Sequence, residues 1–275
     1  MRGGTVILAT SPFDINSQGS LTAQTLDSGL SDWLACQGVG LEQKLVLDPQ
    51  NAAFPIPVNR RVAGFMVQET RLVDYSYFAD IREDGMEQES GLAAGLNQVT
   101  LTWPSPIQLD EAKNQGRRVI RLLQSSDQAW TSDSLDIQPD YAAHGQLGFL
   151  YGKERGSQLL AVALEGRFDS YFKDKPSPLA VMDTAADAGD TQADSEQRDT
   201  AKESSAQTDG PVISRVIDRS PESARIILFA STSFLTDEML NLASSGLGTR
   251  YLKPVQLVEN AIDWSLEDRG LLSIR

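Results

Sequence analysis

The stretch that decides the fold is Arg225-Ile226-Ile227-Leu228-Phe229-Ala230, followed by Ser231-Thr232-Ser233 and Phe234-Leu235-Thr236-Asp237-Glu238-Met239-Leu240. The apolar run predicts a buried strand, the three small polar residues a tight turn, and the residues after them a capped helix. A second helix is predicted over residues 255–267 and a last strand over residues 271–275. A strand flanked by helices, with small polar residues at its carboxyl end, is typical of an open α/β sheet.

Working outward, further apolar runs predict strands over residues 4–10, 44–47, 99–103, 118–123 and 159–164. Residues 62–68 and 72–77 are predicted to pair as two strands. A short helix is predicted over residues 29–37, with Ser28 as its cap and Gly38 as its end. The strand that begins at Gly4 leads us to expect a domain of a longer protein, attached to a membrane only through segments outside this sequence.

The composition excludes several classes of function. The net charge of -14 and the pI near 4.5 argue against nucleic acid and against an anionic membrane surface, because both partners require a basic patch. No apolar run approaches the roughly 18 to 20 residues that span a bilayer. The ordinary interpretation of the acidity is solubility.

Cys36 and His144, the single cysteine and the single histidine, exclude a Cys/His zinc cluster. Cys36 ends a predicted amphipathic helix rather than a nucleophile elbow, so we expect a small buried side chain. His144 lies in a predicted loop with no acid nearby to orient it. No glycine-rich loop follows a strand, and no metal ligand set is visible, so the sequence predicts no catalytic residue, metal or cofactor.

An acidic stretch over residues 183–210 contains eight acids, two bases and no aromatic residue. With almost nothing to bury, it is predicted to be disordered. The chain after it is too short to fold alone, so we interpret the stretch as an insertion in a single domain spanning residues 1–275.

Small polar residues follow four of the predicted strands, at Thr10-Ser11, Ser125-Ser126, Gly166-Arg167 and Ser231-Thr232-Ser233. Asp14, Asp127 and Asp237 also follow strands, where turn or cap acids are common. If the strands are parallel, these positions gather at one edge of the sheet. Such an edge suits a small polar ligand or the backbone of a partner, and it is equally typical of strand exits with no further role. The candidate ligand-binding residues are Ser11, Asp14, Ser126, Arg167, Ser231 and Ser233.

Several segments together resemble a known family: Gly3-Gly4 with Val6-Ile7-Leu8, Gly29-Leu30-Ser31-Asp32-Trp33-Leu34, Leu45-Val46-Leu47-Asp48, Leu160 to Phe172, and Asn260-Ala261-Ile262-Asp263-Trp264. With Arg225 to Asp237, they are similar to the extracytoplasmic domain of GldG-type gliding-motility and ABC-2 transporter auxiliary proteins. That domain is related to the N-terminal part of an intraflagellar transport protein. The resemblance covers nearly the whole chain except the acidic insertion.

The resemblance implies a three-layer α/β/α domain with a mainly parallel sheet, distantly similar to glutamine amidotransferases. It implies a non-enzymatic binding or scaffolding role on the periplasmic or extracytoplasmic face of the inner membrane. The implied partners are an ABC permease and its ATPase, with a polysaccharide or a peptide as a possible ligand. The alternative is a divergent hydrolase or amidotransferase-like enzyme that acts at the strand-exit edge.

Overall fold

A computed structural model describes residues 4–17, 21–62, 65–175, 217–247 and 250–266 of the chain. The acidic insertion predicted over residues 183–210 and the strand predicted over residues 271–275 lie outside these described residues. Within the described part, no helix has both the length and the apolar character needed to cross a membrane.

The centre of the fold is a four-stranded sheet, in the order β1 (Thr5–Ala9), β13 (Arg225–Phe229), β12 (Leu159–Glu165) and β10 (Arg118–Gln124). The prediction of these four strands is confirmed. β1 and β13 are parallel, whereas β12 is antiparallel to both of its neighbours, β13 and β10. The prediction of a mainly parallel sheet is therefore wrong, and the fold is a mixed α/β arrangement of mostly antiparallel strands with few helices.

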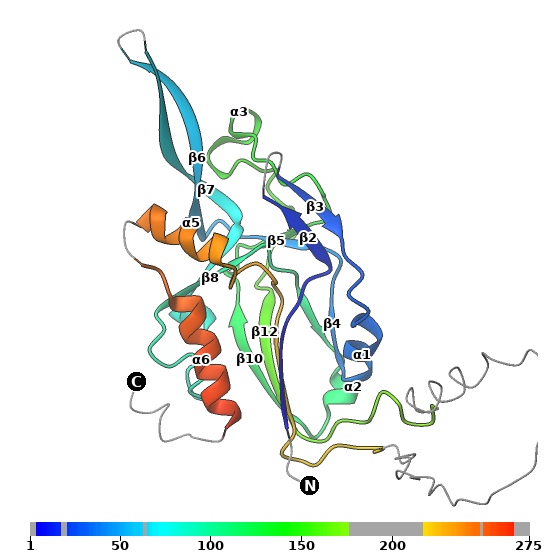
Figure 1. The fold of residues 1–275 in the computed structure, drawn as a ribbon. Coiled ribbons are helices and arrows are strands. Elements are labelled where there is room, and N and C mark those ends of the chain that lie inside the picture. The colour runs from blue at the N-terminus through cyan, green and yellow to red at the C-terminus, as the bar shows by residue number, and fades with distance from the viewer. Residues whose placement is uncertain (1–3, 18–20, 63–64, 176–216, 248–249, 267–275) are drawn as a thin grey trace, which may run out of the picture.

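The two faces of this sheet are covered by different elements, because alternate residues of a strand point to opposite faces. Ile227 and Phe229 pack in one cluster with Trp264 of α6 (Lys253–Ser265), and Ile226 and Leu228 pack in another with Leu34 of α1 (Ser31–Cys36). Figure 1 shows α6 and α1 on opposite sides of the sheet. A short two-stranded sheet of β4 (Val39–Leu41) and β9 (Ile107–Leu109) lies beside α1.

The α1 helix begins two residues later than the sequence predicts. Its N-cap is Leu30, which makes no side-chain capping bond, so the prediction of Ser28 as the cap is wrong. Ser28 Oγ instead accepts a hydrogen bond from the Leu30 backbone N–H at 3.4 Å. Gly38, with a φ of +82°, follows the helix as predicted, because glycine takes this backbone conformation without a steric cost.

The second large sheet has the order β6 (Asn51–Val62), β7 (Phe65–Arg82) and β8 (Gln98–Thr102), all antiparallel. β6 and β7 form a long hairpin that projects from the body (Figure 1). Val62 pairs with Phe65, and residues 65–77 all belong to β7, so the predicted strand pair 62–68 and 72–77 is wrong. We call residues 51–62 and 65–74 the arm.

Between the arm and the central sheet lies an aromatic cluster that includes Tyr75, Phe78, Trp103 and Trp130. The remaining elements surround it or close the body: β2 (Phe13–Asn16), β3 (Thr22–Thr25), β5 (Leu45–Leu47), β11 (Trp130–Ser132), α2 (Glu111–Asn114), α3 (Tyr141–His144) and α5 (Asp237–Leu247). The core thus continues from the central sheet to the base of the arm, where α5 packs on β6.

Candidate binding site

The strand directions separate the four strand exits that the sequence places together. Ser11, Ser126 and Ser231 follow β1, β10 and β13, which run the same way. Gly166 and Arg167 follow β12, which runs the opposite way, so they lie at the other end of the sheet. The expected convergence of all four exits on one edge is wrong.

The hydroxyls at the first end are engaged within the protein. The Ser231 side chain is fully buried, and its Oγ donates a hydrogen bond to the Thr102 carbonyl oxygen at 2.6 Å. Ser126 Oγ donates to Asp48 Oδ1 at 2.7 Å, and Ser233 Oγ shares a 2.7 Å hydrogen bond with Thr102 Oγ1. These hydrogen bonds connect the ends of β10 and β13 to Asp48 and Thr102, so the hydroxyls have a structural role.

Ser11 borders an open groove. Its Oγ accepts a hydrogen bond from the Phe13 backbone N–H at 3.1 Å, and the side chain is buried. The groove has a volume of about 610 Å³ and lies between residues 10–12, the loop 25–29 and α1. Asp27 and Asp32 place negative charge on its wall, but Ser126 and Ser231 do not line it.

The other predicted residues are dispersed. Asp14 is exposed on β2, opposite Gln24 of β3. Arg167 pairs with Glu222 at 2.9 Å, and both side chains are more than half exposed. Cys36 ends α1 and His144 ends α3, and Figure 1 shows these two helices far apart. A Cys–His nucleophile pair is therefore not present.

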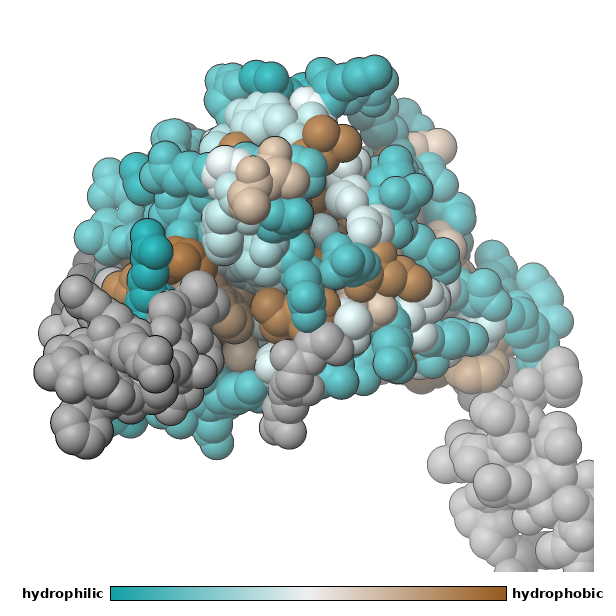
Figure 2. Space-filling model, turned by 90° about the horizontal axis from the view of Figure 1, so that it is seen from above, coloured by the Kyte–Doolittle hydropathy of each residue, from teal (hydrophilic) through white to brown (hydrophobic). Residues whose placement is uncertain are grey.

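A different site lies at the base of the arm, between the second sheet and α5. We call it the root pocket. It has a volume of about 150 Å³, similar to an apolar cavity that accommodates one benzene ring. Most of its wall is apolar, with Leu72, Phe78, Phe234, Met239 and Pro254 among the lining side chains. Figure 2, which views the molecule from above, shows apolar residues interspersed among hydrophilic ones on this upper face.

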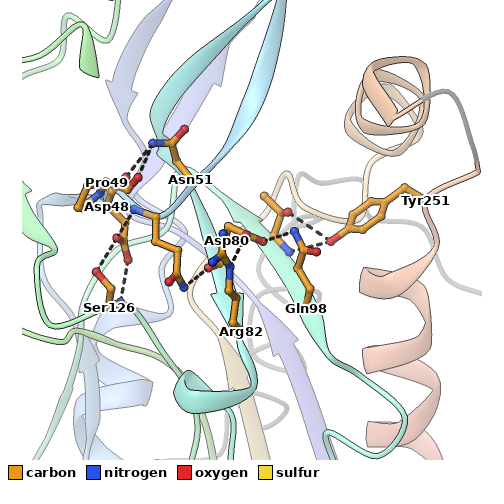
Figure 3. A network of polar contacts seen from close by, with 10 residues as sticks. Asp48, Pro49, Asn51, Asp80, Arg82, Gln98, Ser126 and Tyr251 are labelled. Carbon is orange, nitrogen blue, oxygen red and sulfur yellow. Dashed lines mark hydrogen bonds and ion pairs between the residues drawn. The ribbon is translucent and has the colours of Figure 1, made fainter. Parts of the chain in front are cut away.

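Four polar residues line the pocket, namely Gln98, Thr100 and Thr102 of β8 and Tyr251 of the α5–α6 connection. The Tyr251 hydroxyl accepts a hydrogen bond from the Thr100 backbone N–H at 2.9 Å and lies 3.3 Å from Thr100 Oγ1 (Figure 3). Burial raises the pKa of Tyr251, so the hydroxyl keeps its proton at neutral pH.

Behind Gln98, Asp80 of β7 is almost fully buried. Gln98 Nε2 donates to Asp80 Oδ1 at 2.6 Å, and Arg82 Nε donates to Oδ2 at 3.3 Å (Figure 3). Burial raises the pKa of Asp80, while the two hydrogen bonds lower it, and burial prevails. Because its oxygens hold Gln98 and Arg82, Asp80 fixes the Gln98 amide at the rim of the pocket.

The root pocket is a small, mostly apolar cavity. The side chains that line it include neither a nucleophile with a neighbouring base nor an acid–base pair. Among the described residues, no cluster of His, Cys, Asp and Glu is arranged to hold a metal ion. What the geometry provides is a small apolar cavity with an oriented amide at its rim.

No pattern in the sequence predicts this pocket. Its lining comes from five separate segments, and single apolar residues such as Leu72 and Met239 have no local pattern that marks a cavity.

Comparison with known proteins gives one result. The model of a family described as "ABC-type uncharacterized transport system" matches residues 1–261. Neither a curated protein nor a solved structure shows significant similarity to the chain.

Proposed function

The chain belongs to the family of auxiliary components of ABC-type transport systems, and from this premise we propose that it is a non-catalytic binding domain of such a system. The observation that carries the proposal is the root pocket, an apolar cavity with one oriented amide and no catalytic group. Its partners are the ABC permease and ATPase of the same system. The domain stands on the extracytoplasmic face, as the GldG-type resemblance implies.

The chemistry of the pocket favours a peptide over a polysaccharide as the ligand. Its volume of about 150 Å³ matches one aromatic or branched aliphatic side chain. A sugar presents several hydroxyls, each of which loses hydrogen bonds to water on entering an apolar cavity. Gln98 at the rim offers its amide to the backbone of a peptide whose side chain fills the pocket.

The alternative, a hydrolase that acts at the strand-exit edge, has less support. Ser126 and Ser231 donate their hydroxyl protons to Asp48 and to the Thr102 carbonyl, and Ser231 is fully buried. An activity screen tests this alternative directly. Turnover of an ester, amide or glycoside that disappears in Ser126→Ala or Ser231→Ala would favour the enzyme.

The binding proposal is tested by filling the pocket from within. Ala243 of α5 lines the pocket, so Ala243→Phe places a ring in the cavity. The matched control is Ala112→Phe on α2, which is exposed and remote from the pocket. Ligand-observed NMR with N-acetyl amino-acid amides measures the binding of single side chains.

We expect the phenylalanine and leucine amides to bind the parent protein and Ala112→Phe, and to lose binding to Ala243→Phe. The serine and glutamate amides serve as negative probes. Absence of binding by every apolar amide, or binding that Ala243→Phe leaves unchanged, would contradict the proposal. Co-purification with the permease and ATPase is measured separately, because partner binding through another surface survives the filled pocket.

A further inference from the structure

The two long edges of the arm are not equivalent. β8 pairs only with residues 78–82 of β7, and β6 is the other neighbour of β7. Among the described residues, the stretch Phe65–Leu72 therefore has β6 on one side and no strand on the other. Figure 1 shows this part of the arm standing clear of the body.

The backbone directions identify which residues of β7 face the open side. The Tyr75 N–H donates to Asn51 Oδ1, on the β6 side, and the Asp74 carbonyl of the same peptide accepts from the Tyr141 hydroxyl on the other side. Facing alternates along a strand. Leu72, Thr70, Gln68 and Met66 therefore present their backbone N–H and C=O groups outward.

The opposite edge of the arm is protected against strand pairing. Pro55 and Pro57 of β6 are the register partners of Leu72 and Thr70. They share the outward facing of those partners, so the outer edge of β6 lacks two N–H donors. Proline on an edge strand is a common barrier to pairing with another chain. The outer edge of β7 contains no proline and keeps every donor.

The open edge of β7 ends at Asp74, near the base of the arm. Tyr141 of α3 donates to the Asp74 carbonyl, and Gln146 Nε2 donates to Asp74 Oδ2 at 2.9 Å. A strand that pairs with β7 is thus limited to residues 66–72. Such a short pairing corresponds to a small interface and a weak association.

The sequence of this edge is complementary to itself. In an antiparallel pair centred on Thr70, residue 70 faces its own copy and residue 69 faces residue 71. Within the limit at residue 72, that register pairs residues 68–72 with their copies and sets Glu69 opposite Arg71 twice and Thr70 opposite Thr70. Opposite charges and matched β-branched residues stabilise cross-strand pairs. Centring on residue 69 sets Glu69 against Glu69, and centring on residue 68 sets Glu69 against Val67.

We propose that the open edge of β7 binds β7 of a second copy of this chain, antiparallel and centred on Thr70, to form a six-stranded sheet across a twofold axis. The arm carries three arginines against two acids, in a chain with a net charge of -14. Contact through the arms therefore keeps the acidic bodies apart while the neutral-to-basic parts meet.

Exchange of the paired charges tests the proposal. Glu69→Arg sets Arg against Arg71, and Arg71→Glu sets Glu69 against Glu, so each variant alone should dimerise at least about tenfold more weakly. Glu69→Arg/Arg71→Glu restores both pairs and should recover the dimer. An equimolar mixture of the two single variants should recover it as a heterodimer. Sedimentation equilibrium measures each case.

A disulfide reports the register. In a Cys36→Ser background, Thr70→Cys sets two cysteines directly opposite, at the Cα separation of about 5.5 Å that a disulfide accepts. Oxidation should yield a covalent dimer. The matched control Leu72→Cys faces residue 68 and should not crosslink. A parent protein that stays monomeric at every concentration, or single charge variants that dimerise as the parent does, would overturn the proposal.

Discussion

At one end of the central sheet, the hydroxyls of Ser126 and Ser231 are held by Asp48 and by the Thr102 carbonyl. At the other end, guanidinium groups pair with carboxylates, and these pairs differ in burial. Arg225 is 4% exposed beside Glu165, whereas Arg167 is 58% exposed beside Glu222. From this comparison we expect the contribution of a polar group to stability to depend on how deeply the group is buried, and not on whether it is a hydroxyl or an ion pair.

The largest expected effect is at the buried charged end. Trp264 is 2% exposed, and its ring lies 4.5 Å from the Arg225 guanidinium carbon. Trp264→Ala should lower the free energy of unfolding by about 3–5 kcal/mol, because it leaves a large cavity and uncovers Arg225. Urea denaturation measures the change. Ile262→Ala, on the exposed side of the same helix, is the control and should alter stability by less than about 1 kcal/mol.

The two ion pairs offer the direct comparison. Arg225 donates to Glu165 Oε1 through Nε at 3.1 Å and Nη2 at 2.9 Å, and through Nη1 to the Trp264 carbonyl. Arg225→Ala removes the buried partner of Glu165 and should lower the free energy of unfolding by about 3 kcal/mol. Arg167→Ala should cost less than about 1 kcal/mol, because water screens its exposed pair. Equal losses would show that burial does not decide the difference.

Ser231→Ala measures the hydroxyl end. It removes the donor to the buried Thr102 carbonyl, and we expect a loss of about 1 kcal/mol. Thermal and urea unfolding measure it, with Ser170→Ala as a control at a half-buried loop position. A loss of unfolding free energy as large as that of Arg225→Ala would show that the hydroxyl end stabilises the fold as much as the charged end does.

The sequence predicts the positions of the central strands, but it predicts neither their directions nor the pocket and the arm. The runs 118–123, 159–164 and 225–230 predict strands because each is apolar and bounded by turn residues. Their directions are set by long connections with no local signal, so the sequence predicts the wrong end of the sheet for Gly166 and Arg167. The pocket around Leu72 and Tyr251, and the length of the arm, depend on contacts between distant segments.

A smaller, pH-dependent effect is expected at Asp80, which is buried away from both ends of the sheet. Burial raises its pKa in the folded protein. The protonated form therefore favours folding, and its contribution to stability is lost as pH rises from about 4, the usual pKa, through the raised value. Asp80→Asn has no carboxyl group to titrate at this position. The free energy of unfolding of the variant, relative to that of the parent, should therefore increase as pH rises from about 4 through the raised pKa of Asp80. A constant difference between pH 4 and 7 would contradict the assignment.

The smallest effect is expected for the acidic insertion. Deletion of residues 183–210, with a short Gly/Ser linker in their place, should shift the melting temperature by no more than a few degrees, because the stretch has eight acids and no aromatic residue. Differential scanning calorimetry tests this. Failure of the deletion variant to fold would show that the insertion packs on the domain.

The pairing of β1 with β13 imposes a delay during synthesis of the chain. Thr5 pairs with Arg225, so β1 waits during synthesis for a partner strand 220 residues later in the chain. At the usual rate of synthesis, that wait lasts roughly 10 to 45 s. Throughout it, the segment Thr5-Val6-Ile7-Leu8-Ala9 is an uncharged, apolar strand former without a neighbour, the kind of segment that associates with other nascent chains. β10 and β12, which pair with each other, are both synthesised well before β13, so their pairing does not depend on this wait.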